Sequence, residues 1–297
     1  MHLRAKLEEI VASCPGQLGL AVRNLATGET VGIDADQWFP TASVFKVPLL
    51  VELYRRVDAG EIDLLERVAL TESMKTPGSG VLKEMGEGAS LTLKDLATLM
   101  IILSDNTATD ILMERLDGSR SVQRTMQALG MEGVSVVFDC KALLLSASGL
   151  DMTDRSRANL DEAARRLRHE AYNFETTAFA PDPSINNMAT PNGLMRLYEA
   201  IERRQIVSPD ACDAMLDILE RQQLRERIPL YLPRQIRIAH KTGTIGWTRN
   251  DSGIIRVPGA GPVVLVALTQ RVPLGQARDA DAAIAAAAKA VYTHFEA

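Results

Sequence analysis

Aromatic side chains and histidines are scarce in this chain of 297 residues. Phe, Trp and Tyr together make up 4% of it, and only four residues are His. A chain with so few aromatic rings is poorly suited to stacking nucleic-acid bases. The formal net charge of −5 at pH 7 also opposes binding to a phosphate backbone. We therefore expect no nucleic-acid partner.

Cysteine is also scarce, and its placement excludes two common kinds of site. The chain has three cysteines, Cys14, Cys140 and Cys212. A disulfide framework needs more cysteines and an even number of them. None belongs to a C-x-x-C pair, which argues against a zinc ribbon and against a thioredoxin-type redox site. We expect each of the three to be an ordinary buried thiol.

Long hydrophobic runs are absent as well. No run of roughly 18 apolar residues occurs, so we expect no transmembrane helix and no membrane partner. Residues 1–10 are charged and amphipathic, and they lack the apolar centre of a signal peptide. With Met1 in first place, this favours a cytoplasmic protein. A periplasmic or secreted location is the alternative if a leader precedes the numbered chain. We expect a monomer.

The composition that remains is that of an ordinary globular protein, with 46% hydrophobic and 24% charged residues. At this length about three quarters of the unfolded surface can be buried, so a deep cleft is feasible. Short strand patterns occur near both ends of the chain, and helical spacing fills the middle. The expected strands are 18–24, 30–33, 236–239, 251–257 and 262–269. The expected helices are 1–10, 44–57, 92–103, 106–116, 159–170, 188–202 and 280–295.

Strands at both ends with helices between them predict an α+β fold. The simplest packing is one sheet built from the two termini, flanked by the terminal helices, with an inserted all-helical lobe. On this interpretation residues 1–297 form one unit, with an α/β lobe from 1–40 and 225–297 and a helical lobe from 41–224. Ligand pockets favour such junctions, so we expect the site where the lobes meet.

Several familiar catalytic motifs are missing. The chain has no G-x-S-x-G, no H-E-x-x-H, no Walker loop and no G-x-G-x-x-G. Four histidines do not by their number rule out a Ser-His-Asp triad, but no local motif supports one. If the chain is a hydrolase, we expect its general base to be a residue other than histidine.

Lysine is a suitable base in one short motif, Ser43-Val44-Phe45-Lys46, which begins a predicted helix. Residues three apart on a helix share a face, so Ser43 and Lys46 are expected within hydrogen-bond reach. A serine hydroxyl becomes nucleophilic when a neighbour takes its proton. A lysine whose pKa is lowered can do so. An S-x-x-K pattern is expected by chance about once in such a chain, so the motif alone is weak evidence.

A second polar motif, Ser104-Asp105-Asn106, lies between two predicted helices. One interpretation is structural, with Ser104 or Asp105 as the N-cap of the following helix. The functional interpretation is that Ser104 relays a proton between the lysine and a leaving group. Asn106 would then hold both the substrate and the lysine.

The third motif, Lys241-Thr242-Gly243-Thr244, is expected at the end of a strand. A polar strand end with a turn glycine is the structural interpretation. In the functional interpretation Lys241 and Thr242 bind a substrate carboxylate, and Gly243 lets the strand approach the ligand. The backbone N–H groups of Ser43 and Thr244 would form an oxyanion hole.

The three motifs occur in this order at a predicted helix start, between two predicted helices and on a late strand. In this arrangement they resemble the motifs of class A β-lactamases and penicillin-binding proteins. The segments 41–50, 103–110 and 241–251 are similar to the family's motif regions, and the resemblance is weakest between about 132 and 187. It implies the family's fold with an antiparallel sheet, and a serine hydrolase that forms an acyl-enzyme on Ser43. The implied substrate is a small molecule, a β-lactam or related cyclic amide, with no metal and no cofactor.

One family feature is missing. Class A members carry an E-x-x-L-N pattern whose glutamate activates the water that removes the acyl group, and no such pattern occurs within 132–187. Counting from Ser104 places the expected position at 139–141, where there is no glutamate. Acylation should therefore survive, whereas deacylation lacks its usual base. The substitutes we consider are usually solvated surface charges: Glu162, Glu170, Glu175 and Lys141.

Two other functions remain open. The missing glutamate and the absence of a signal peptide favour an amidase, esterase or peptidase acting on another small acyl compound. A third hypothesis is a slowly deacylating penicillin-binding protein or an inactive scaffold. The segment 76–82 resembles the broader family of β-lactamase-related hydrolases more than dedicated resistance enzymes.

Overall fold

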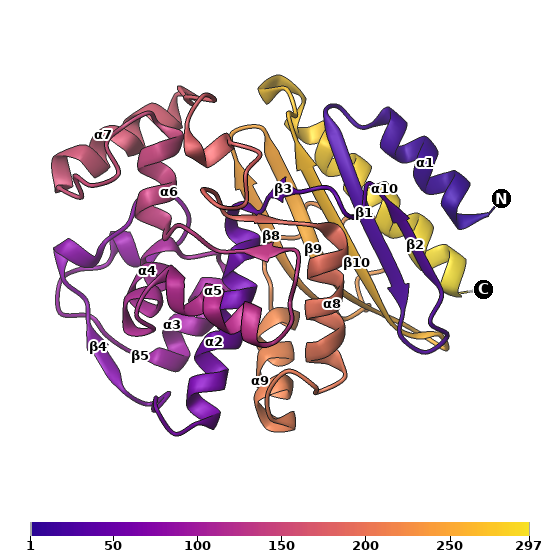
Figure 1. Ribbon diagram of the computed structural model, residues 1–297, viewed down its shortest axis with the longest axis horizontal. Helices are drawn as coiled ribbons and strands as arrows, with labels where there is room; N and C mark the ends of the chain where they lie inside the picture. The colour runs from indigo at the N-terminus through magenta and orange to yellow at the C-terminus, as the bar shows by residue number, and fades with distance from the viewer. Residues whose placement is uncertain (1, 297) are drawn as a thin grey trace.

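A five-stranded antiparallel sheet is the centre of the computed structural model, which describes residues 2–296 (Figure 1). Its strand order is β2-β1-β10-β9-β8, so the first two strands of the chain lie beside the last three. This confirms the α+β fold with a sheet made from both ends of the sequence. The strands are β1 (Gln17–Asn24), β2 (Thr30–Ile33), β8 (Ile238–Ile245), β9 (Thr248–Val257) and β10 (Gly261–Gln270).

The central strand is apolar on both faces because both faces are covered. Residues 263–268 of β10 form an unbroken buried run, typical of a strand between two layers. The terminal helices α1 (Leu3–Ser13) and α10 (Ala277–Glu296) cover one face (Figure 1). Helix α8 (Pro191–Glu202) lies against β1, β9 and β10 on the other.

Helices α3 (Leu93–Ile102), α4 (Asn106–Arg115), α5 (Ser119–Ala128) and α9 (Pro209–Glu220) pack around α2 (Lys46–Asp58), whose first nine residues are all buried. A helix buried on all sides lies in the core of its layer. Two more helices, α6 (Cys140–Ala147) and α7 (Arg157–Arg168), follow α5 in the chain. Short strands join them: β3 (Phe39–Pro40), β4 (Arg67–Ala69), β5 (Ser90–Thr92), β6 (Val134–Ser135) and β7 (Met188–Ala189). The lobe boundaries at 40 and 225 stay a prediction.

Three local expectations were wrong. Ser43 lies in a short 3-10 turn, Ala42–Phe45, and α2 begins only at Lys46. Met188 and Ala189 form a strand and are not part of α8, which starts at a proline in its first turn. The strand expected at 236–239 instead spans Ile238–Ile245 as β8, and the 241–244 motif lies at its end before a tight turn, as expected.

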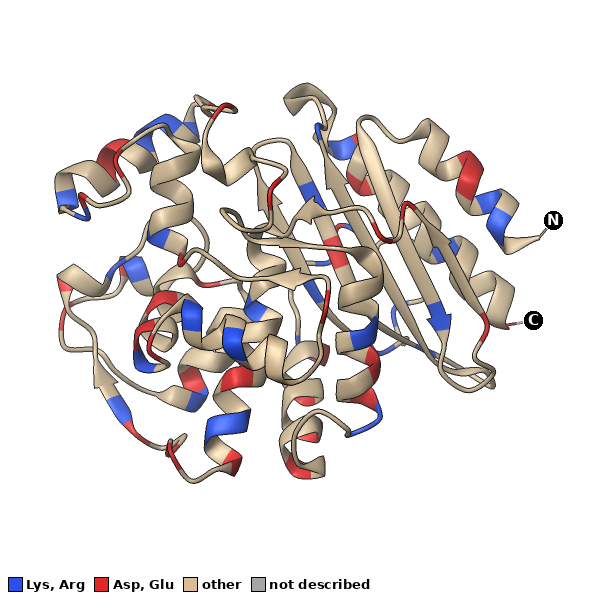
Figure 2. Cartoon of the chain, viewed as in Figure 1, with Lys and Arg blue, Asp and Glu red and all other residues tan. Residues whose placement is uncertain are grey.

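Charged side chains of both signs are interspersed around the molecule (Figure 2). Within residues 2–296, no helix is both long enough and apolar enough to cross a bilayer.

Candidate active site

The 3-10 turn that carries Ser43 is held in an unusual backbone conformation. Ala42, just before the serine, has a φ of +45°, in the left-handed region that alanine rarely adopts. Such strain persists where the surroundings over-determine the backbone. Here the Thr41 N–H donates to the Asn187 carbonyl, and the Asn250 side chain donates to the Thr41 carbonyl. The turn therefore presents a half-buried serine side chain on a fixed backbone.

Lys46 is completely buried at the start of α2, one turn after Ser43. Its ammonium donates three hydrogen bonds, to the Ser104 carbonyl at 2.8 Å, to Ser104 Oγ at 3.1 Å and to Asn106 Oδ1 at 2.8 Å. The Lys46 ammonium makes no other hydrogen bond to the described residues, so the expected contact between Lys46 and Ser43 is not formed. Burial lowers the pKa of Lys46, opposed by the negative charges nearby.

The second motif contains the N-cap considered from the sequence and also contacts Lys46. Asp105 caps α4, because its side chain accepts the Ala108 N–H at 2.9 Å. Ser104, with a φ of +55°, turns its carbonyl and hydroxyl toward Lys46. The Asn106 carbonyl oxygen accepts from Lys46, and its amide nitrogen donates to the Pro77 carbonyl at 2.9 Å. The structural and the functional interpretation are thus compatible.

Lys241 is fully buried within β8, and its ammonium donates to the Thr242 carbonyl at 2.8 Å. Burial holds the pKa of Lys241 well below its ordinary value, and the nearby positive charge of Lys46 lowers it further. The two lysines are therefore electrostatically coupled.

Gly243 allows β8 to lie directly against the turn that carries Ser43. A Cβ atom at this position would stand 2.4 Å from the Thr41 carbonyl oxygen and 3.2 Å from the Ser43 nitrogen. The structure shows that the glycine makes room for this backbone, and the expected close approach of the strand to a ligand stays a prediction. The close approach sets the spacing between Ser43 and Thr244.

The variant Gly243→Ala is expected to retain the fold and to lose at least about 10²-fold in the rate of Ser43 acylation, since a displacement near 1 Å at a reacting group has that effect. The measurement is the acylation rate by time-resolved intact mass. Gly275→Ala, at a glycine with open space around it and no left-handed φ, is the matched control. Equal rates in wild type and Gly243→Ala would show that the spacing is not critical.

Arg227 is a site residue that the sequence did not reveal. Its guanidinium donates to the carbonyls of Gly243 and Asn250 and to Thr244 Oγ1 at 2.6 Å, and it pairs with Asp281 of α10. This arginine is buried and brings a positive charge behind the Thr244 end of the site. It lies in an irregular segment between α9 and β8, where no motif marks it.

A cavity of 160 Å³ lies at the meeting point of these elements. It brings together Ser43, Asn106 and Thr244 from the three motifs, and Lys46 and Ser104 lie directly behind them. Thirteen residues line the cavity: Ala42, Ser43, Phe45, Gly78, Ser79, Asn106, Cys140, Leu143, Leu144, Leu167, Tyr172, Thr244 and Ile245.

Cys140, the first residue of α6, occupies the region where the resemblance would place a glutamate. Its thiol donates a weak hydrogen bond to Asn106 Oδ1 at 3.5 Å, the oxygen that also accepts from Lys46. Burial raises the pKa of Cys140 well above its ordinary value, so the thiol is neutral at pH 7. The thiol is buried as expected, and it also lines the cavity beside Ser43.

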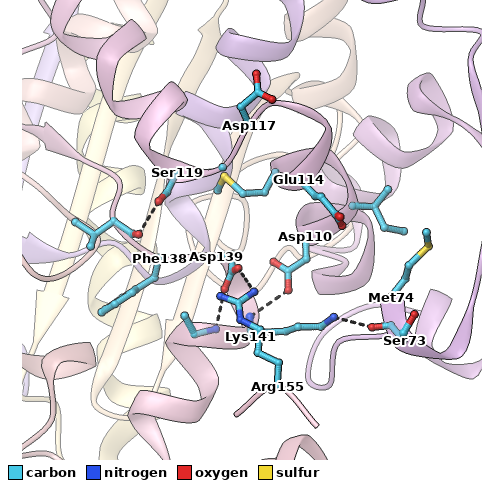
Figure 3. A pocket seen from close by; sticks show the side chains of 15 residues that line it. Ser73, Met74, Asp110, Glu114, Asp117, Ser119, Phe138, Asp139, Lys141 and Arg155 are labelled. Atoms are coloured by element: carbon cyan, nitrogen blue, oxygen red, sulfur yellow. Dashed lines mark hydrogen bonds and ion pairs between the residues drawn. The ribbon is translucent and has the colours of Figure 1, made fainter. Parts of the chain in front are cut away.

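The four substitutes considered for the missing base do not line this cavity. Glu162 is paired with Arg165 and Arg166 on α7, and the Lys141 ammonium donates to the Ser73 carbonyl. Lys141 points into a second hollow of 730 Å³, which lacks Ser43 (Figure 3). Glu170 and Glu175 lie in the chain after α7, outside the set of lining residues.

Asp110 connects this second hollow with the active site. Its buried carboxylate accepts the Lys141 N–H at 3.1 Å (Figure 3). It also accepts the Cys140 N–H at 2.7 Å and the Thr76 hydroxyl at 2.8 Å. It thereby fixes the start of α6 beside the cavity. Burial, as the largest cause, raises the pKa of Asp110 to about 6.

The raised pKa of Asp110 predicts how its replacement changes stability with pH. Between pH 4 and 6 the folded protein keeps a proton that the unfolded chain releases, because the ordinary pKa is 3.8. The contribution of Asp110 to wild-type stability therefore falls across this window as pH rises, by up to about 3 kcal/mol. In Asp110→Asn this loss is absent, so its stability relative to wild type should increase from pH 4 to pH 7. Urea unfolding at both pH values measures this, and a difference independent of pH would contradict it.

Comparison with known proteins agrees with the geometry. Residues 2–295 match the model of the Beta-lactamase enzyme family. The β-lactamase VEB-1 of Pseudomonas aeruginosa is 24% identical over 276 residues, which cover 90% of this chain and 81% of that protein. The crystal structure of a β-lactamase from Sphaerobacter thermophilus is 30% identical with a TM-score of 0.79, covering 99% of this chain and 96% of its own.

A penicillin-binding relative is equally similar in fold. A variant of PBP-A, solved as an acyl-enzyme complex with penicillin G, is 27% identical with a TM-score of 0.78, and the match covers 99% of this chain and 96% of that one. The family model extends over nearly all of the residues that form the sheet, the helices and the cavity. This chain belongs to the Beta-lactamase enzyme family.

Proposed function

We propose that this protein is a serine hydrolase that is acylated on Ser43 by a β-lactam or related cyclic amide and then hydrolyses the acyl-enzyme. The observation that carries the proposal is the convergence of all three motifs on one cavity. The family match and the β-lactamases among its relatives support the choice of a β-lactam substrate.

In the acylation step the Ser43 hydroxyl oxygen bonds to the amide carbonyl carbon while its proton passes to Lys46. For this Lys46 must be neutral, which its lowered pKa favours, and it must exchange one of its hydrogen bonds to Ser104 or Asn106 for a contact with Ser43. The C–N bond then breaks. The Ser104 hydroxyl, 3.1 Å from the Lys46 ammonium, takes a proton from Lys46 and gives its own proton to the departing nitrogen. The Ser43 and Thr244 N–H groups stabilise the oxyanion.

The other end of the site is suited to an anionic group on the substrate. Lys241, Thr242 and Arg227 lie together at the Thr244 side, and Arg227 already holds the Thr244 hydroxyl. A substrate carboxylate placed there would favour the charged form of Lys241. Asn106 would orient the amide while it continues to hold Lys46.

Deacylation is proposed as the slow step of turnover. Among the thirteen described residues that line the cavity none is a carboxylate, and the Cys140 thiol is neutral. Water must therefore attack the acyl-enzyme without a carboxylate base in the cavity, and Lys46 is the nearest other base. The same observation favours a second function, that of a penicillin-binding protein whose acyl-enzyme persists.

Intact-mass spectrometry during turnover of penicillin G tests these functions. The opened ring stays attached, so the expected adduct carries the whole mass of penicillin G. We expect it to dominate during turnover, to decay once substrate is exhausted and to be absent in Ser43→Ala. Ser73→Ala, a serine in the second hollow, is the control. A persistent adduct would select the penicillin-binding function, and no adduct with any β-lactam would overturn both.

A further inference from the structure

A histidine–aspartate pair is buried in the central sheet, outside the active-site cavity. His240 lies in β8 and Asp251 in the neighbouring strand β9, and neither lines the cavity. Both side chains are completely buried, and His240 Nδ1 lies 2.9 Å from Asp251 Oδ1. We infer that Asp251, oriented by His240, is a positioning residue that holds Arg227 at the Thr244 end of the site. This inference rests on the proposed function, because that function gives the Thr244 end its anionic ligand.

The pair lies on the face of the sheet opposite to Lys241. Successive side chains of a strand point to opposite faces, so the side chains of His240 and Lys241 point away from each other. Asp251 is opposite Thr242 in the register of the two strands and therefore shares the His240 face. On this face the sheet is covered by α10 and by the segment that contains Ile228. The pair therefore contacts that segment and not the substrate.

Asp251 fixes the backbone of this segment with its second carboxylate oxygen. Asp251 Oδ2 accepts the Ile228 N–H at 3.0 Å, one residue after Arg227. Residues 222–237 contain no helix or strand, so hydrogen bonds within such elements do not hold their backbone. Among the described residues, the bond to Asp251 is the only hydrogen bond that ties the backbone of residues 224–236 to the sheet. Loss of this bond should therefore free the chain beside Arg227.

The position of Arg227 matters because its guanidinium reaches both active-site strands. It donates to one backbone carbonyl of β8, to one of β9 and to Thr244 Oγ1. Asp281 holds the end of the side chain through an ion pair at 2.6 Å, whereas Asp251 holds the backbone from which the side chain starts. A guanidinium is a rigid planar fork, so a shift of its backbone would disturb all of these bonds together.

The hydrogen bonding of His240 indicates that this residue orients Asp251. With a carboxylate as its partner, Nδ1 is assigned as the donor, and Nε2 is buried without a partner among the described residues. A buried polar atom without a partner is costly and rare. Gly253 lies opposite His240, where a Cβ atom would stand 2.6 Å from the His240 Cα, so β9 lies close against this residue. The ring thus makes a single hydrogen bond, and that bond turns Asp251 toward Ile228.

The test compares acylation of Ser43 by penicillin G with acylation by its methyl ester, which lacks the carboxylate charge. In the wild type the second-order rate should be at least about 10-fold higher with penicillin G, the value of one hydrogen bond to a charged group. Asp251→Val has no side-chain acceptor for the Ile228 N–H. The ratio of the two rates should fall about 10-fold in this variant, because Arg227 is no longer held in place.

Conservative variants distinguish the anchor from a general loss of stability. Asp251→Asn keeps an oxygen for the Ile228 N–H and should keep the wild-type ratio. His240→Leu should lower the ratio, and His240→Asn, whose amide nitrogen can take the place of Nδ1, should restore it. Tyr198→Phe is the matched control, because it removes a buried hydrogen bond to Ser252, the next residue of β9, and should leave the ratio unchanged.

A double variant identifies the residue through which Asp251 acts. Arg227→Met alone should lower the ratio, and the addition of Asp251→Val should lower it no further. A further fall in the double variant would overturn the positioning role. So would an unchanged ratio in Asp251→Val, or equal rates for penicillin G and its ester in the wild type. Each of these results leaves acylation of Ser43 intact.

Amide hydrogen exchange in residues 224–236, followed by mass spectrometry, needs no substrate and separates this inference from the proposed function. Exchange should become at least about 10-fold faster in Asp251→Val and stay near the wild-type rate in Asp251→Asn. If neither compound acylates the wild type but exchange responds in this way, the proposed function is wrong and the anchoring of Arg227 stands. Equal exchange in all three proteins would show that Asp251 does not hold this segment.

Discussion

Replacing Lys46 by methionine is expected to lower the rate of Ser43 acylation at least about 10²-fold, the range typical of a positioned general base. Methionine fills much of the same buried space but cannot accept the serine proton. The substitution also leaves the Ser104 carbonyl without its Lys46 donor and Asn106 Oδ1 with only the weak Cys140 thiol donor, which should lower the melting temperature. Acylation by penicillin G, followed by rapid-quench intact mass, measures the effect.

Lys75→Met is the matched control for this experiment. Lys75 is also buried and is paired with Glu72, but it does not line the Ser43 cavity. It should show a similar or smaller loss of stability with an acylation rate near that of wild type. If Lys46→Met, confirmed as folded by circular dichroism, acylates at the wild-type rate, lysine is not the base.

Replacing Cys140 by glutamate is expected to raise the rate of deacylation about 10²-fold. Cys140 lines the cavity and touches Asn106 Oδ1, so a longer side chain here would bring a carboxylate to the acyl-enzyme. A positioned base contributes about 10²–10⁴-fold to a water attack. The added negative charge should also raise the pKa of Lys46, so acylation should require a higher pH.

The neutral variant Cys140→Gln separates the base from the shape of the side chain. It has the size of glutamate without its basicity, so its deacylation rate should stay near that of wild type. The decay of the penicillin G adduct after removal of free substrate gives both rates. Equal decay in the Glu and Gln variants would mean that the missing carboxylate is not what limits turnover.

The sequence was sufficient for those parts of the fold with strong local signals. The hairpin of β1 and β2 and the helices α3 and α4 follow from periodic apolar residues and clear turn residues. Helices α5, α6 and α9 were not predicted. Helix α6 has only eight residues, and it is fixed by Asp110, a residue 30 positions earlier in the chain. Such a tertiary contact has no periodic signature.

The site was predicted as a set of residues, but not with its geometry. Ser43, Lys46, Ser104 and Asn106 are marked by their motifs. The 3-10 turn at Ser43 depends on the contacts of Thr41 and on the missing side chain of Gly243, which only the folded sheet brings together. Isolated residues such as Arg227 and Cys140 carry no pattern of their own, because their roles come from distant neighbours.

The most direct test of the account is to locate the acyl group by peptide mapping after brief exposure to penicillin G. The cavity holds one half-buried serine next to a buried lysine, with the hydroxyl of Ser104 and the thiol of Cys140 close by. We predict one adduct, on the peptide that contains Ser43. An acyl group found on Ser104 or Cys140, or an adduct that survives in Ser43→Ala, would contradict the assignment of the nucleophile.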